Sequence, residues 1–85
     1  MQDFERLKAL LDTEHEWPSE YQFKFITLSE HVNDLSQVFE NDTIRFKRSK
    51  TGRYVGLTVN RRIKSSDEVI DVYKKAAAIE GVIAL

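Results

Sequence analysis

The spacing of the apolar residues switches repeatedly along this chain, and each switch marks a change of secondary structure. Apolar side chains two residues apart indicate a half-buried strand, and a spacing of about 3.6 residues indicates an amphipathic helix. Strand spacing occupies residues 21–28, 43–50 and 53–62, and the apolar residues 82–85 are predicted as a last short strand. Helical spacing occupies residues 29–40 and 65–81. The predicted order after residue 20 is therefore β-α-β-β-α-β.

This order of elements is typical of the ferredoxin-like fold. The fold class predicted here is accordingly α+β, with a four-stranded antiparallel sheet and two helices on one face of it. The second and third strands are joined by a short turn that contains Gly52, which is typical of a β-hairpin. The first and third strands are expected to be the central ones, so Lys24 should lie close to Thr58.

A further helix is predicted at the N-terminus, over about residues 2–13. Its apolar residues at helical spacing are Phe4, Leu7, Leu10 and Leu11. Pro18 disfavours helical geometry at Trp17, so the segment between this helix and the first strand is predicted as a linker. The chain is thus divided into an N-terminal helix with its linker, residues 1–16, and a ferredoxin-like domain, residues 17–85.

Individual residues predict where the two helices of the domain begin and end. Ser29 can cap the first helix, and Ser65 with Glu68 can form a capping box at the start of the second. Gly81 is positioned to end the second helix. Gly56 interrupts the apolar alternation of a strand, which predicts a bulge or a close approach of another backbone.

Length and composition limit the functions open to this chain. At 85 residues it is predicted to form one small domain. It has no Cys, which excludes disulfides, Cys-based zinc sites and thiol catalysis. The first residues carry acidic charge and lack the apolar run of a signal peptide, and no later run is long enough to span a bilayer. A cytoplasmic protein without membrane association is therefore expected.

Charge is distributed very unevenly along the sequence. Residues 1–42 hold ten acids and three bases, whereas residues 43–66 hold eight bases and no acid. Residues 67–85 hold four acids and two bases, so the formal net charge is only −1. The net charge argues against a dedicated nucleic-acid binder, but the basic segment is a local candidate for binding something anionic.

The alternation in the predicted strands assigns each side chain to one face of the sheet. The side chains expected to face the helices are Ile44, Phe46, Val55, Leu57 and Val59, with Tyr21, Phe23 and Phe25 from the first strand. The opposite face is expected to carry Arg45, Lys47, Tyr54, Thr58, Asn60 and Arg62, with Gln22, Lys24 and Ile26. That face is therefore polar and cationic, with one aromatic ring.

Three stretches of the sequence resemble a known bacterial family. They are "WPSEYQFKFI", the hairpin "KRSKTGRYVGLTVN" and the ending "IEGVIAL". Over residues 17–85 the chain resembles the domain of unknown function DUF493, the YbeD-like proteins. The resemblance implies a ferredoxin-like fold similar to the regulatory ACT domains of metabolic enzymes. It implies no known activity, and it brings no catalytic residues to carry over.

The leading functional hypothesis is a small non-enzymatic regulatory or adaptor domain that binds a protein partner, or a second copy of itself, through the open sheet face and the basic hairpin. The hypothetical binding residues are Lys24, Arg45, Lys47, Tyr54, Thr58 and Arg62 on the sheet, with Lys50 and Arg53 at the turn. The bland alternative is that these bases only keep the sheet soluble and discourage edge pairing.

Two further alternatives stay open at this stage. Single-stranded nucleic acid could bind the same face, because RNA-recognition motifs share this topology and stack bases on their central strands. Here Tyr54 is the only ring expected there. Small-ligand sensing of the ACT type is weakened because the turn at residues 27–32 lacks the Gly usual in ligand-binding ACT domains.

Other chemistry finds little support in the sequence. His15 lies between two Glu residues in the linker and His31 lies near Asp34, and both are expected to be surface residues rather than metal ligands. No Gly-rich phosphate loop is present. Asn60 and Arg61 faintly resemble the residues that acylphosphatases use, without the loop that cradles phosphate. No catalytic residue, metal or cofactor is therefore predicted.

Overall fold

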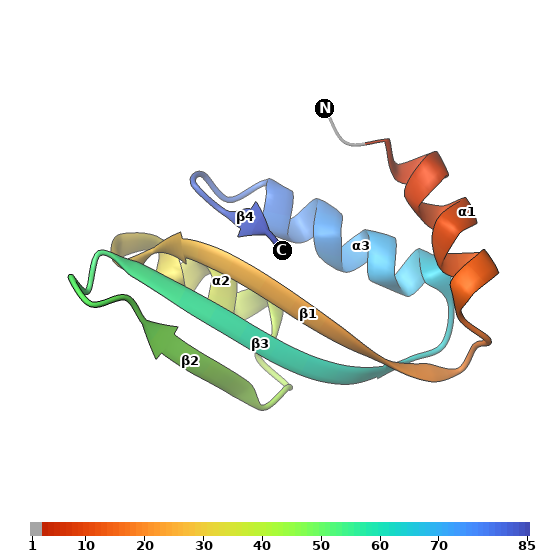
Figure 1. Ribbon diagram of the computed structural model, residues 1–85, viewed down its shortest axis with the longest axis horizontal. Coiled ribbons are helices and arrows are strands. Elements are labelled where there is room, and N and C mark those ends of the chain that lie inside the picture. The colour runs from red at the N-terminus through yellow and green to blue at the C-terminus, as the bar shows by residue number, and fades with distance from the viewer. Residues whose placement is uncertain (1–2) are drawn as a thin grey trace.

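The computed structural model describes residues 3–85 and has the predicted ferredoxin-like architecture (Figure 1). Its elements are α1 (Phe4–Glu14), β1 (Ser19–Leu28), the 3-10 turn η1 (Ser29–His31), α2 (Val32–Val38), β2 (Ile44–Arg48), β3 (Tyr54–Ile63), α3 (Ser66–Ala77) and β4 (Ile83–Ala84). The four strands form one sheet in the order β2-β3-β1-β4, and each pairing is antiparallel. The predicted fold class is confirmed, and β1 and β3 are the central strands.

The core lies between the sheet and the helices, as the alternation predicts. Phe23 and Phe25 of β1 are buried, and Lys24 between them is exposed on the other face. Across the sheet, Phe23 pairs with Val59 and Phe25 with Leu57, and all four belong to the core. The predicted facing of the central strands is therefore confirmed, and the aromatic rings of β1 lie inside the protein.

Phe46 is the most exposed of the side chains expected to face the helices. It pairs with Leu57 and so lies on the helix-facing side, but 54% of its surface is exposed. The predicted facing is therefore correct, but the ring is not buried there. β2 is an edge strand, and α2 has only seven residues, about 10 Å of helix. Helical cover therefore ends before it reaches the middle of β2.

Several predicted helix boundaries need correction. The first helix of the domain begins as η1 at Ser29, whose hydroxyl bonds the carbonyl of Gly52 in place of capping a helix. At α3, Ser65 is the N-cap residue, but its side chain makes no capping bond, and Glu68 accepts from the amide of Lys64. α3 ends at Ala77, before Gly81.

The N-terminal helix packs against α3. Asp3 caps it by accepting a hydrogen bond from the amide of Arg6, and Leu11 is buried. Lys8 Nζ lies 3.0 Å from both the hydroxyl of Ser66 and a carboxylate oxygen of Asp67. These contacts hold α1 against the start of α3. The predicted first residue of this helix, Gln2, lies outside the described residues.

A pH-dependent contact is expected where α1 meets the linker. Hydrogen bonds from the Ser66 hydroxyl and from the Trp17 indole lower the pKa of the Asp12 carboxyl. A carboxyl with a lower pKa in the folded state stabilises the fold above its ordinary pKa, and this contribution is lost as pH falls through the lowered value. We expect the Trp17 contact to loosen below the ordinary pKa of 3.8.

Fluorescence of Trp17, the only Trp in the chain, measures this loosening as a red shift of its emission. The control is Asp12→Asn, which removes the titrating group and should already show weakened contact at neutral pH. An unchanged acid transition in Asp12→Asn would show that another group is responsible.

Candidate functional site

The face of the sheet opposite the helices, called the open face below, gathers the predicted site residues. The strand register places Lys24 of β1, Thr58 of β3 and Arg45 of β2 in one row across the sheet. The neighbouring row holds Ile26, Gly56 and Lys47. The predicted proximity of Lys24 and Thr58 is confirmed.

The remaining predicted site residues lie around these two rows. Tyr54 precedes Gly56 on β3 and is 41% exposed. Arg62 lies further along β3, opposite Glu20, and so belongs to the far end of the open face. Lys50 and Arg53 lie in the turn between β2 and β3. The structure thus groups Lys24, Arg45, Lys47, Tyr54 and Thr58, and leaves Arg62 apart from them.

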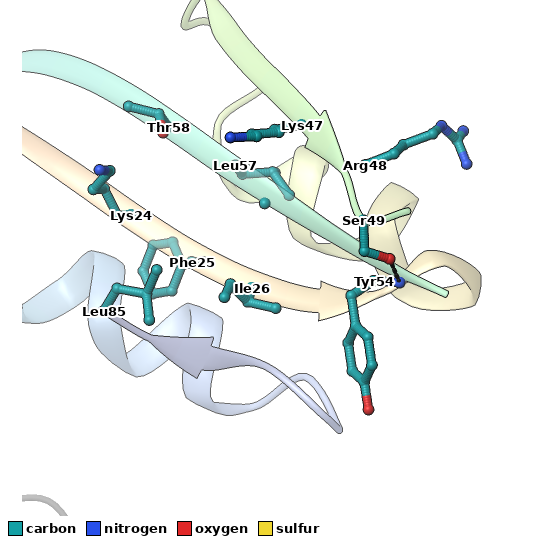
Figure 2. Close-up of a pocket in the computed structure, with 11 residues that line it drawn as sticks. Lys24, Phe25, Ile26, Lys47, Arg48, Ser49, Tyr54, Leu57, Thr58 and Leu85 are labelled. Carbon is teal, nitrogen blue, oxygen red and sulfur yellow. Dashed lines mark hydrogen bonds between the residues drawn. The ribbon is translucent and has the colours of Figure 1, made fainter. Parts of the chain in front are cut away.

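Gly56 creates a hollow in the middle of the open face. The ladder continues through it, since it pairs with Ile26 on one side and Lys47 on the other, so the predicted bulge is absent at this position. Because Gly56 has no side chain, a depression of about 310 Å³ opens above it (Figure 2). Its lining combines apolar atoms of Ile26 and Leu85 with the bases Lys24 and Lys47.

The hairpin turn is tied to the rest of the sheet. The amide of Ser49 donates to the carbonyl of Tyr54 at 2.9 Å, and the Ser49 hydroxyl accepts from the amide of Tyr54 at 3.2 Å. Gly52 has a φ of +74°, which favours glycine at this position. The amide of Ser29 donates to the carbonyl of Arg53 at 2.9 Å. The turn is therefore held in place beside the end of β1.

The aromatic ring of the open face already has a cationic neighbour. The guanidinium of Arg53 lies 5.6 Å from the centroid of Tyr54, within the range of a cation–π contact. Among residues 3–85, the other aromatic residues of β1 and β3 face the core or its margin. The paired stacking rings of an RNA-recognition motif therefore have no equivalent on this part of the surface.

Some bases elsewhere in the protein are paired with acids, whereas the predicted basic site residues are not paired with any in the described part of the chain. Lys8, Arg61 and Lys75 each lie within 4.0 Å of a carboxylate. Within residues 3–85, no carboxylate lies that close to any of the predicted basic site residues, which are Lys24, Arg45, Lys47, Lys50, Arg53 and Arg62. The open face and its turn therefore carry uncompensated positive charge.

Arg61 is bound to Asp42 of the same chain, unlike the phosphate-binding Arg that the comparison with acylphosphatases suggests. Its Nε donates to both carboxylate oxygens of Asp42, at 3.2 and 3.1 Å. Hydrogen bonding to Asp42 raises the pKa of Arg61 despite its partial burial. Glu68 lies 3.8 Å away, and the ring of Phe39 packs beneath the guanidinium. Arg61 thus joins the loop before β2 to β3 and α3.

The two histidines have surroundings typical of surface residues. His15 stacks on Trp17 with ring centroids 5.1 Å apart, and His31 lies 4.0 Å from Asp34. Across residues 3–85, no three His, Cys, Asp or Glu side chains form a group suited to a metal ion. In the same range, no helix combines the length and apolar character needed to cross a membrane.

The fold and its open basic face define a small α+β sandwich domain. A family model for the protein of unknown function DUF493 matches residues 12–85, and the chain belongs to that family. The match confirms the resemblance of the sequence to DUF493.

One solved structure illustrates the shared fold. The solution structure of protein HP0495 from H. pylori is similar with a TM-score of 0.67 at 17% sequence identity, over 88% of this chain and 92% of that one. At this identity the likeness shows the fold alone. No curated protein matches this chain.

Proposed function

We propose that this chain is a non-enzymatic adaptor or regulatory domain of the cytoplasm that binds an acidic surface of a protein partner on its open face. The observation that carries the proposal is the clustering of Lys24, Arg45 and Lys47 on one face: among residues 3–85 none of them has a carboxylate within 4.0 Å, whereas Lys8, Arg61 and Lys75 are paired with acids. Burying these charges against a complementary surface gives specificity and fast association.

The hollow above Gly56 can receive a side chain of the partner. An acidic side chain entering it would meet apolar atoms of Ile26 and Leu85 below and the ammonium groups of Lys24 and Lys47 around the rim. Tyr54 borders the same hollow and presents the large, partly exposed aromatic surface that is typical of interface hot spots. Lys50 and Arg53 extend the positive field along the turn and steer the partner.

A second copy of the chain is an alternative occupant, since residues 1–42 hold an excess of acids. Such self-association would be sensitive to salt and to protein concentration. Sedimentation velocity at low and physiological salt distinguishes the two occupants: a monomer at all concentrations leaves a different protein as the partner.

The proposal is tested by affinity capture from a nuclease-treated lysate of the source cells. We expect Lys24→Gln combined with Lys47→Gln to reduce the captured partner about tenfold, because two uncompensated charges leave the contact. The matched control, Arg6→Gln with Lys75→Gln, removes the same charge from α1 and α3 and should capture as much as the unmodified protein. Equal losses in both pairs would show that capture follows net charge alone and would contradict docking at this face.

A neutral variant adds a second arm to the same experiment. In Gly56→Val the added Cβ would lie 3.7 Å from the nearest heavy atom, an ordinary contact, and Val suits a strand. The variant should fold and fill the hollow without altering charge. Loss of the partner in Gly56→Val supports docking in the hollow, whereas full capture would place the contact elsewhere on the face.

A further inference from the structure

β2 is an edge strand whose outer side is open. It lies at one end of the strand order β2-β3-β1-β4, and Figure 1 shows it outermost. Its five residues pair with β3 in continuous register, without a bulge or a Pro. The opposite edge, β4, has only two residues. β2 is therefore the longer free edge of the sheet.

The backbone groups that β2 presents outward follow from the hydrogen bonds at the turn. The amide of Ser49 donates to Tyr54, so this pair is hydrogen-bonded across the hairpin. Hydrogen-bonded and non-hydrogen-bonded pairs alternate along an antiparallel ladder. Lys47 and Arg45 therefore direct their backbone groups toward β3. The N–H and C=O groups of Ile44, Phe46 and Arg48 point to the free edge.

The side chains of β2 alternate in the same way. Arg45 and Lys47 lie on the open face without a carboxylate partner among residues 3–85. Phe46 lies on the other side and is more than half exposed. An extended segment with acids on one face and apolar residues on the other would complement both sides of this strand.

The bases of β2 determine what charge an added strand must carry. If a second copy paired its own β2 antiparallel to this one, Arg45 and Lys47 would meet the same bases of the copy, and like charges opposed across strands are destabilising. Basic residues on an edge discourage neutral and basic strands in general. Phe46, in contrast, favours pairing at this edge, because its exposed ring offers apolar surface to an added strand.

We propose that β2 accepts an extended acidic segment of a partner protein as a fifth strand, with its acids against Arg45 and Lys47 and its apolar side chains against Phe46. Strand addition of this kind draws affinity from main-chain hydrogen bonds and specificity from alternating side chains. The inference rests on the proposed function and deepens it, since the added strand would continue the acidic contact from the open face onto the edge.

The test uses amide hydrogen exchange of the full chain with a synthetic peptide, acetyl-Glu-Val-Glu-Leu-Glu-Val-Glu-amide. At a peptide concentration about ten times its Kd, we expect exchange of the outward amides of Phe46 and Arg48 to slow about tenfold. The control peptide has the same composition with all acids in one block. It should leave these amides unchanged, because it cannot place acids on one face of a strand.

Other outcomes separate this inference from the proposed function. If the alternating peptide shifts the resonances of Lys24 and Lys47 without slowing exchange at Phe46 and Arg48, it binds the open face only, and strand addition is overturned while the proposed function stands. Strand addition is also overturned if the peptide does not bind. The capture experiment, in contrast, tests the proposed function itself, which is contradicted if the open-face variants and the control variants lose the partner equally.

A pair of variants tests the outward hydrogen bond directly. Phe46→Ala and Phe46→Pro both lack the ring, but only the Pro variant lacks the N–H that points to the free edge. We expect the Pro variant to bind the peptide about fivefold more weakly than the Ala variant. Unchanged amide resonances of Arg45 and Lys47 would show that the β2–β3 ladder is intact. Equal affinities with an intact ladder contradict the proposal.

Discussion

Replacing Phe23 by alanine is expected to lower the free energy of unfolding by about 4 kcal/mol. The Phe23 ring is fully buried and packs against the rings of Phe25, Phe39 and Tyr73, with centroids 5.7 to 6.4 Å apart. Removing the ring leaves a cavity between β1 and the helices α2 and α3. Because small domains are stabilised by only about 5–15 kcal/mol, the loss is a large share of the total. Urea unfolding followed by circular dichroism measures it.

Phe46→Ala is the matched control, with the same change in side chain at an exposed position. Its expected cost is about 1 kcal/mol or less, because the ring is already half in water. Comparable losses in the two variants would mean that Phe46 is packed in the core, and the edge of β2 would then not be open.

Asp42→Asn is expected to cost about 2–3 kcal/mol, since it leaves the charge of Arg61 without its main partner. The side chains are 14% and 25% exposed, so water replaces the lost carboxylate poorly. The guanidinium would keep only the more distant Glu68. The loop before β2 should loosen as a result. Thermal unfolding and amide exchange of residues 42–44 measure the two effects.

The control for this change is Asp71→Asn, which breaks an exposed pair with Lys75 at i, i+4 on α3. Exposed pairs of this kind contribute about 0.3 kcal/mol. An equally small effect of Asp42→Asn would show that the Arg61 pair does not hold the loop.

The alternation of apolar residues predicts most of this fold correctly. Burying Lys24 or Gln22 in the core would be costly, so alternation predicts that Phe23 and Phe25 face the helices. In the structure both rings are buried on that side of the sheet. At Phe46 the predicted facing is also correct, but the ring is exposed. Alternation assigns a side chain to a face, but it does not say whether a helix is long enough to cover that face at the edge of the sheet.

The candidate site was only partly predictable for a similar reason. The excess of bases in residues 43–66 and the alternation predict a cationic face, but the hollow depends on which neighbours surround Gly56 in adjacent strands. The glycine itself is a local signal, but it predicts a bulge or a close approach of another backbone rather than a hollow. Ser29 likewise looked like a helix cap, yet its partner Gly52 is distant in sequence. Contacts that depend on tertiary register are not visible in a local pattern.

The central claim is that the open face binds acidic protein rather than nucleic acid. Amide NMR titrations at physiological salt test it most directly, with the alternating acidic peptide in one series and a pool of short RNA and single-stranded DNA in the other. We expect resonances of Lys24, Arg45, Lys47, Tyr54 and Thr58 to shift together with the peptide, and not with the nucleic acids. Joint shifts of the same five residues that persist only with the nucleic acids would contradict the account.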